Sequence, residues 1–375
     1  MKFVVSSIEL FSHMQSISKV INPKNTLPIL DNFLFKLEGN NLEITASDLE
    51  TTMITSIQLE NVMETGVIAI PSKLMLDTLK EFPEQPLTFN VDTNSMKITI
   101  SSENGQFTLA GHDGNDFPQV PSIKANSTSV TMPAEALSKG ITRTIFATSD
   151  DELRPIMNGI LFEFTSKSVV FVASDAQKLV KYERTDVTGS AESQFVLPKK
   201  PANLLKGVLS KENGQVKLDF DSKNAVFTLS GYKLVCRLAE GQFPSYNAVI
   251  PQDNPNTMTV DRAELSNAIR RVSVFSNPAS NLIKLMIKGN ELVLSAQDID
   301  FSISAYERLR VNYEGTDIEI GFKSVFLIEL LSNISTSEIL LELSDPSRAG
   351  LIKPINTEDT KENIIMLLMP MMINA

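Results

Sequence analysis

The chain has 375 residues, of which 42% are hydrophobic and 21% are charged, and its formal net charge is −11. This length predicts two to four domains, and the composition is that of a folded rather than a disordered protein. A single cysteine, Cys236, excludes an internal disulfide framework. The sequence has no membrane-length apolar run and no signal-peptide cleavage site, so we expect a cytoplasmic protein without a membrane partner. Taken alone, the acidic charge argues against a nucleic-acid partner.

The first third of the chain combines helical and extended patterns. Helical stretches are predicted at 7–20, after an opening strand, and at 72–82. Alternating apolar and polar residues at 96–101 and 106–111 have the period of half-buried strands. The SENG segment between them is typical of a hairpin turn.

The same order of elements follows twice more along the chain. The predicted helices are 133–146, 199–210, 261–275 and 323–333, and a second hairpin is predicted at 216–221 and 226–231. Leu137 with Ile141 shows the spacing of an amphipathic helix. Pro133 stands where a first-turn proline is tolerated, and Asp261 can cap its helix.

Two anchors recur at the same spacing of about 125 residues. The first is an aspartate after an apolar run, and the second is a lysine at the start of each second helix. The six residues are Asp48, Asp175, Asp298, Lys73, Lys200 and Lys323. A period of this length is that of a domain. We therefore expect three repeated α+β domains, 1–125, 126–253 and 254–375, each with two helices packed on antiparallel sheet.

The sequence offers little for catalysis. Only two histidines occur, His13 and His112, and no zinc-ligand spacing, phosphate-binding loop or nucleophile elbow is present. The recurring aspartates follow strands, where such residues usually hydrogen-bond the local backbone in turns. We expect a protein that is not an enzyme, with no catalytic residues, no metal and no cofactor.

Several short segments, taken together in their order along the chain, resemble the bacterial sliding clamp family, the β subunit of DNA polymerase III. They are MKF at the start, TLPIL (26–30), ASDLE (46–50), DFP (116–118), MNGILFE (157–163), ASD (173–175), QFPSY (242–246) and LLMPM (367–371). The resemblance implies a non-catalytic processivity factor that forms a head-to-tail homodimer, a ring lined by twelve helices. Helices of ordinary spacing would leave a bore of roughly 24 Å, wide enough for a duplex.

The resemblance and the charge pattern together predict DNA-binding residues. The six helical stretches carry a basic excess, so the negative charge lies elsewhere, which suits a bore that contacts phosphates without reading bases. Residues Lys24, Lys73, Arg154, Lys199 and Lys200 correspond to DNA-contacting positions of the family. Lys139 and Arg143 are added because they make their helix basic.

The resemblance also implies a pocket for a short extended peptide with glutamine and Leu/Phe anchors. The matching residues are Met157, Ser174, Ala176, Gln177, Lys178, Leu179, Pro244, Ala248, Val249, Leu367, Leu368, Met369, Pro370, Met371 and Met372. Its partners would be the α subunit of the replicative polymerase, the clamp loader and other proteins with clamp-binding motifs. Methionines in the tail can adapt to several ligands, and Pro370 should end the last strand.

The implied dimer contact joins the first domain of one copy to the third domain of the other. Phe107 and Leu109 would meet Val274 and Phe275.

Two other interpretations remain open: a β-rich repeat scaffold that binds protein or glycan, and an enzyme that uses the clefts between domains. The scaffold does not explain the recurring lysines, and the enzyme lacks clusters of titratable residues.

Overall fold

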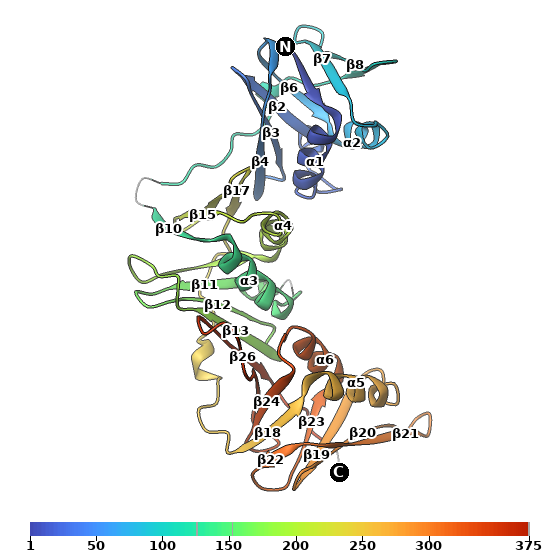
Figure 1. Ribbon diagram of the computed structural model, residues 1–375, viewed down its shortest axis with the longest axis vertical. Helices are drawn as coiled ribbons and strands as arrows, with labels where there is room; N and C mark the ends of the chain where they lie inside the picture. Colours follow the sequence, from blue (N-terminus) through green and yellow to red (C-terminus); the bar gives the residue numbers. More distant parts are fainter. Residues whose placement is uncertain (125–126, 152, 374–375) are drawn as a thin grey trace. The chain divides into compact units, whose positions relative to one another are not determined.

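The computed structural model describes residues 1–124, 127–151 and 153–373, so the predicted boundary between residues 125 and 126 lies outside the described residues. The chain divides into two compact units (Figure 1). One consists of Met1–Ser138 and Lys200–Leu238, and the other of Lys139–Lys199 and Ala239–Ala375. The central predicted repeat therefore contributes to both units.

The first unit contains an antiparallel sheet of eight strands. In spatial order these are β10 (Thr128–Pro133), β15 (Gln215–Phe220), β16 (Asn224–Thr228), β17 (Tyr232–Arg237), β4 (Thr51–Gln58), β3 (Asn41–Ser47), β2 (Asn32–Glu38) and β6 (Gly66–Pro71). The predicted hairpin at 216–231 is present as β15 and β16. Strand β17 pairs with β4, with Tyr232 opposite Thr55, so one sheet continues from the second predicted repeat into the first (Figure 1).

A second sheet of the first unit has five strands. Their order is β5 (Asn61–Glu64), β1 (Lys2–Ser6), β7 (Pro86–Asp92), β8 (Lys97–Ser101) and β9 (Gln106–Ala110). Strands β8 and β9 form the predicted hairpin. Strand β9 is the last in the sheet and most of its residues are exposed.

The second unit contains an antiparallel sheet of nine strands. Their order is β14 (Ser193–Pro198), β11 (Gly159–Phe164), β12 (Val169–Ser174), β13 (Lys178–Arg184), β26 (Glu362–Leu368), β25 (Gly350–Pro354), β24 (Glu338–Leu343), β18 (Asn256–Asp261) and β22 (Asn312–Glu314). Strand β13 pairs with β26, with Leu179 opposite Leu367 (Figure 1). This pairing brings strands of the second and third predicted repeats into one sheet.

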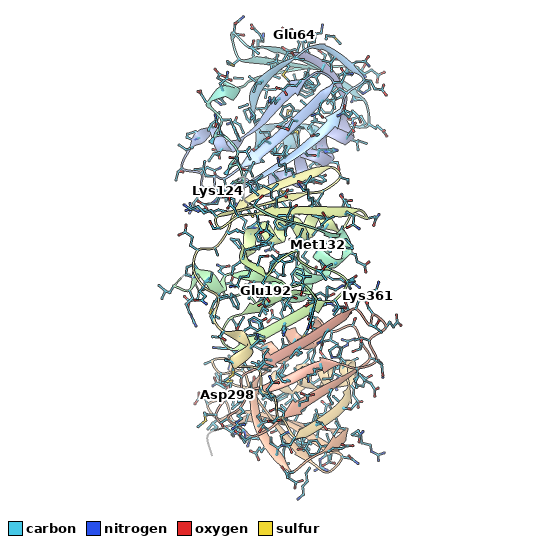
Figure 2. The ribbon with its side chains drawn as sticks, turned by 90° about the vertical axis from the view of Figure 1, so that its left-hand side faces the viewer. Glu64, Lys124, Met132, Glu192, Asp298 and Lys361 are labelled. Carbon is cyan, nitrogen blue, oxygen red and sulfur yellow. The ribbon has the colours of Figure 1, made fainter. Side chains whose placement is uncertain are left out.

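A four-stranded sheet completes the second unit. Its order is β21 (Ile303–Arg310), β20 (Glu291–Asp298), β19 (Leu282–Lys288) and β23 (Ile318–Lys323). Strand β21 lies at its edge. On β19 the alternate residues Ile283, Leu285 and Ile287 are fully buried and face the core shared with α5 (Arg262–Ser273) and α6 (Ser324–Ser332). Figure 2 shows the side chains of this region, with Asp298 at the end of β20.

All six predicted helices are confirmed within a few residues at their ends. The other four are α1 (Ser7–Ser18), α2 (Ser72–Lys80), α3 (Ala134–Thr144) and α4 (Lys199–Leu209). The predicted cap is also present, because Asp261 accepts a hydrogen bond of 2.7 Å from the N–H of Glu264. Short 3₁₀ turns are η1 (Pro28–Asp31), η2 (Gly114–Asp116), η3 (Ile145–Ala147), η4 (Pro155–Met157) and η5 (Tyr246–Ala248).

The prediction for Pro133 was wrong by one residue. Pro133 is the last residue of β10, opposite Gln215, and the helix begins at Ala134. The N–H of Ala134 donates to the carbonyl of Gly214 at 2.9 Å. A proline suits the strand end because its fixed φ is compatible with extended backbone and it has no N–H to leave unpaired.

Among the described residues, no helix is long and apolar enough to cross a membrane.

Candidate functional site

The three recurring aspartates are turn residues, as predicted. The Oδ1 of Asp48 accepts from the N–H groups of Glu50 and Thr51, at 3.1 and 2.7 Å. Asp175 repeats this arrangement with Gln177 and Lys178, at 2.9 and 2.8 Å. Asp298 accepts from the N–H of Asp300 at 3.0 Å. Each carboxylate therefore shapes the loop that follows its strand.

Helix α4 is the most clearly basic of the predicted DNA-binding helices. It contains Lys199, Lys200 and Lys206 and no acidic residue. The Nζ of Lys200 donates to the carbonyl of Val20 at 2.7 Å and pairs with Asp48 at 2.5 Å, while 40% of its side chain stays exposed. Lys200 thereby ties α4 to the end of α1 and the turn after β3, which fixes the position of its charge.

The other basic residues predicted in the first unit are exposed. Lys73 lies in the first turn of α2, and Lys24 lies in the turn between α1 and η1. Neither forms an ion pair recorded between described residues. Their charges are available to a ligand in solution without the loss of an internal contact.

Two predicted basic residues of the second unit stand beside carboxylates. Lys199 pairs with Asp150 at 2.5 Å, and the Nε of Arg154 donates to Asp151 at 2.9 Å. The guanidinium of Arg154 lowers the pKa of Asp151. Because these pairs are largely exposed, each is held weakly, and a phosphate can compete for the cation.

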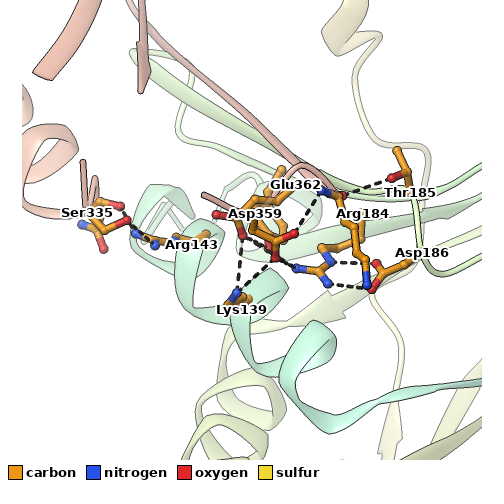
Figure 3. Close-up of polar contacts among 11 residues, drawn as sticks. Lys139, Arg143, Arg184, Thr185, Asp186, Ser335, Asp359 and Glu362 are labelled. Atoms are coloured by element: carbon orange, nitrogen blue, oxygen red, sulfur yellow. Dashed lines mark hydrogen bonds and ion pairs between the residues drawn. The ribbon is translucent and has the colours of Figure 1, made fainter. Parts of the chain in front are cut away.

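Lys139 and Arg143 are placed differently from the prediction. Figure 3 shows both residues of α3 turned toward other parts of the same unit. The Nζ of Lys139 lies 3.4 Å from Asp359 and 3.8 Å from Glu362. Arg143 donates to the carbonyl of Asn333 at 2.5 Å and to the Oγ of Ser335 at 3.1 Å. Their charges hold the unit together, so we withdraw them as DNA contacts.

The predicted peptide pocket lies over one face of the nine-stranded sheet. This face carries an apolar cluster, called here the groove cluster, made of Leu161, Val170, Val172, Leu179, Val196, Phe243, Tyr246, Ala349, Leu351 and Leu367. Two predicted residues, Leu179 and Leu367, are members and lie opposite each other on β13 and β26. If the last strand served only the core, the burial of Leu179 and Leu367 would be explained. The exposed apolar residues next to them would not be.

That rim is formed by the segment around η5. Pro244, Ala248 and Val249 are exposed, and 54% of Val249 is accessible. The segment is anchored by Phe243 and Tyr246, which belong to the groove cluster. The Tyr246 hydroxyl donates to Glu163 at 2.5 Å, and burial followed by this hydrogen bond raises the pKa of the phenol. Because Phe243 and Tyr246 are both packed into the groove cluster, the exposed residues of this segment have a defined position.

Two predicted pocket residues face away from the groove cluster, because side chains alternate between the two faces of a sheet along each β-strand. Lys178 and Leu368 lie opposite each other, one position away from the pair Leu179 and Leu367, so they face the other side of the sheet. Leu368 belongs to the core beneath α5 and α6. The Nζ of Lys178 pairs with Asp175 at 2.7 Å and with Glu329 of α6 at 3.1 Å. Neither side chain reaches the groove cluster.

The remaining predicted pocket residues lie in η4, at the end of β12 and in the turn after it, and in the segment that follows β26. Met157 is buried at the end of η4, and Ser174 donates from its Oγ to the carbonyl of Lys178 at 2.8 Å. Ala176 has a φ of +74° in the turn before β13, next to exposed Gln177. Strand β26 ends at Leu368, before Pro370 as predicted, and Met371 then donates to the carbonyl of Gly321 at 2.8 Å. Met369 and Met372 are exposed.

A polar cleft of about 540 Å³ opens on the opposite side of the 175–178 turn. It is lined by Phe146, Thr148, Ser149, Asp150, Asp175, Gln177, Lys178, Lys199, Lys323, Phe326 and Glu329. Sequence reasoning did not find it, although the repeat anchors Asp175 and Lys323 both lie in its wall. Lys178 and Lys323 place their ammonium groups 4.4 and 4.9 Å from the centre of the Phe326 ring.

The predicted dimer residues lie on the edge strand β9 and just after helix α5. Phe107 and Leu109 are on β9, where Phe107 is 41% exposed and packs edge-on against Phe82 with ring centres 5.2 Å apart. Val274 and Phe275 follow α5, and they are 74% and 38% exposed.

Within the described residues, no cluster of three metal-ligating side chains occurs.

Comparisons with known proteins agree with this architecture. The beta sliding clamp of Pseudomonas putida is 27% identical over 99% of this chain and 100% of its own length, and that of Vibrio cholerae is 26% identical over 98% and 99%. The crystal structure of a Pseudomonas aeruginosa sliding clamp bound to griselimycin covers both chains fully, with a TM-score of 0.94 and 26% identity. A Bartonella birtlesii clamp gives a TM-score of 0.91 at 27% identity.

The fold and the site define a DNA sliding clamp, a non-catalytic processivity factor. Three family descriptions match in chain order: the N-terminal domain of the DNA polymerase III beta subunit at residues 1–121, the central domain at 131–245 and the C-terminal domain at 247–371. The chain belongs to the DNA polymerase III beta subunit family.

Proposed function

We propose that two copies of this chain close head to tail into a ring around duplex DNA and hold the replicative polymerase on it through the groove cluster. The α subunit of the polymerase, the clamp loader and other proteins with clamp-binding motifs would share this groove. The assembly would act in the cytoplasm. The observation that carries the proposal is a pair of unpaired strand edges, β9 and β21, at the ends of two different sheets.

Strand β9 has the character of an edge that becomes paired. Its residues are Gln106, Phe107, Thr108, Leu109 and Ala110, without a charge or a proline. Monomeric proteins usually protect an open edge with lysine, proline or a bulge, because free N–H and C=O groups recruit other strands. Strand β21 is also mostly exposed. Pairing β9 of one copy with β21 of the other satisfies both edges, and repeating that contact closes a ring.

Retention on closed DNA tests the ring. We expect the loaded protein to stay on nicked circular DNA and to leave after the circle is linearised, because only the topology holds it. Phe107→Asp places a carboxylate in the proposed contact between β9 of one copy and β21 of the other. The weakened contact should shorten retention on the circle at least tenfold. Met63→Asp, at an exposed apolar residue of β5, is the matched control and should be retained like wild type. Equal retention on circles and linear DNA would refute the ring.

The DNA contact is proposed for Lys24, Lys73, Arg154, Lys199 and Lys200. Lys24, Lys73 and Arg154 are exposed, Lys199 and Lys200 are half-buried, and α4 carries no acidic residue. Such contacts neutralise phosphates without reading bases, which allows movement along the duplex. The acidic remainder of the chain would repel DNA elsewhere.

The salt dependence of DNA binding tests these lysines. Each phosphate contact contributes about 0.9 to the slope of log K against log salt. The double variant Lys24→Ala with Lys73→Ala should therefore reduce that slope by nearly 2 units in anisotropy titrations of duplex DNA. Lys167→Ala with Lys223→Ala, at exposed hairpin turns, should leave the slope unchanged. A slope equal to wild type in the first variant would remove these two residues from the site.

The groove cluster is proposed to bind an extended peptide with glutamine and Leu/Phe anchors. Leu179 and Leu367 form its floor and Val249 its rim. Changing Val249→Asp should weaken binding of a fluorescent peptide of that composition at least tenfold, because a charge would be buried under the ligand. Since Val249 is exposed, the fold should be unaffected. Unchanged affinity would place the peptide elsewhere, and Met63→Asp again serves as the control.

A further inference from the structure

The methionine side chains differ sharply in their exposure to solvent. Met14, Met258 and Met366 are fully buried, whereas Met286 and Met369 are each 41% exposed. A peroxide can oxidise an accessible thioether to the sulfoxide, which is polar where the thioether was apolar. The effect of such a change depends on what lies beside the exposed methionine.

Strand β26 places the side chain of Met369 on the side of the groove cluster. Leu367 belongs to the groove cluster and Leu368 to the core on the other side of the sheet, and side chains alternate along a strand. The N–H of Met369 donates to the carbonyl of Gln177 at 2.8 Å, one residue beyond the last pair of β13 and β26. Met369 therefore follows Leu367 in the row that faces the groove cluster.

The backbone is held on both sides of Met369. Pro370 follows it and has no N–H to donate, and the N–H of Met371 donates to the carbonyl of Gly321 at 2.8 Å. Because the N–H of Met369 is itself bonded to Gln177, the segment cannot move away without breaking a backbone hydrogen bond. A chemical change in the side chain of Met369 therefore acts beside the groove cluster.

The single cysteine does not compete for the same oxidant. Cys236 is 1% exposed, and burial raises the pKa of its thiol. A peroxide reacts with the thiolate form of cysteine, so Cys236 is protected both by its lack of access and by its proton. The exposed methionines are therefore the sulfur atoms that a peroxide reaches in the folded chain.

We propose that Met369 is an oxidation site, and that its conversion to the sulfoxide by hydrogen peroxide weakens peptide binding at the groove cluster. This inference rests on the proposed function of the groove cluster. The sulfur forms a bond to one peroxide oxygen, the O–O bond breaks, and the other oxygen takes up the remaining proton and leaves as water. The sulfide is oxidised and the peroxide is reduced. The leucine and valine side chains of the groove cluster offer no donor to the new S=O group once a ligand covers it.

Mass spectrometry of peptides after brief treatment with hydrogen peroxide tests the access of the oxidant. Met286 and Met369 should form the sulfoxide to a similar extent, because their exposed fractions are equal, and Met258 and Met366 should stay reduced. If Met369 stays reduced while Met286 is oxidised, the proposed site is overturned.

Peptide affinity before and after peroxide tests the consequence. In wild type the Kd of a fluorescent peptide with glutamine and Leu/Phe anchors should rise about tenfold on oxidation, and reductases for both sulfoxide epimers should restore it. Met369→Leu keeps an apolar side chain of similar volume without an oxidisable sulfur, so its affinity should change less than about twofold on oxidation. Met286→Leu is the matched control, because Met286 is equally exposed, and it should lose affinity on oxidation as wild type does.

The outcomes separate this inference from the proposed function. If untreated wild type binds the peptide and wild type with fully oxidised Met369 binds it equally well, the inference fails and the function of the groove cluster stands. A loss of affinity that persists in oxidised Met369→Leu would place the sensitive sulfur elsewhere and would also overturn the inference. If untreated wild type does not bind the peptide, the proposed function of the groove cluster fails, and this inference fails with it.

Discussion

Replacing Arg184 by alanine is expected to lower the free energy of unfolding by about 1.5–3 kcal/mol, because it removes a buried guanidinium that bridges partly exposed carboxylates. The Arg184 side chain is only 6% exposed. Its Nη2 lies 2.7 Å from Asp186, and its Nη1 lies 2.7 Å from Asp359 in the segment before β26 (Figure 3). The Tyr182 hydroxyl and Glu362 join the same network at 2.8 Å. Urea unfolding at neutral pH measures the loss.

The pH dependence of this loss follows from the aspartates. The guanidinium of Arg184 lowers the pKa of Asp186 in the folded protein. Such a carboxylate stabilises the fold above its unfolded pKa of about 3.9 and loses that contribution as the pH falls toward the folded value. The difference between wild type and Arg184→Ala should therefore narrow below about pH 4.

An exposed ion pair provides the control for Arg184. Lys217 pairs with Asp219 at 3.0 Å, and 57% of its side chain is exposed. Lys217→Ala should cost less than about 1 kcal/mol. A loss for Arg184→Ala no larger than that of the control would show that the network is not a structural support.

Gly140→Ala is expected to destabilise the protein by about 1–3 kcal/mol, although alanine favours helices. Gly140 lies in α3, and a Cβ there would come within 2.5 Å of the Phe171 ring. That ring is fully buried, so it cannot move away without disturbing its own neighbours. The overlap should exceed the gain in helix propensity, which is about 1 kcal/mol.

Gly207 tests the same substitution without the overlap. It lies in α4, and a Cβ there would meet no atom within 4 Å. Gly207→Ala should raise the free energy of unfolding by up to about 1 kcal/mol. Thermal unfolding of the two variants side by side should show shifts of opposite sign. Shifts of the same sign would contradict the role assigned to Phe171.

The predicted elements that the structure confirms depend on neighbours in the sequence. The i, i+4 spacing of Leu265 and Ile269 determines which side of α5 is buried, and Asp261 caps that helix through the N–H three residues away. The turn at Asp175 likewise needs only the N–H groups of the next few residues. Local interactions of this kind can be recognised in any single stretch of sequence.

The assignments that failed depend on partners far along the chain. Lys139 and Arg143 look like free charges on an amphipathic helix until Asp359 and Asn333 arrive beside them. The side of the sheet that Lys178 faces is set by its pairing with Leu368. Residues Ile299 and Phe301 carry no local pattern, so their exposure could only be seen in the folded unit.

The amino-acid sequence by itself determined the repeated α+β elements, their turns and the family, because periodicity, caps and turn residues act over a few positions. The tertiary structure alone decided which cations remain available and which edges stay open. It also showed that sheets continue across the predicted repeats, through β17 with β4 and through β13 with β26. Those properties arise from contacts between residues that only folding brings together.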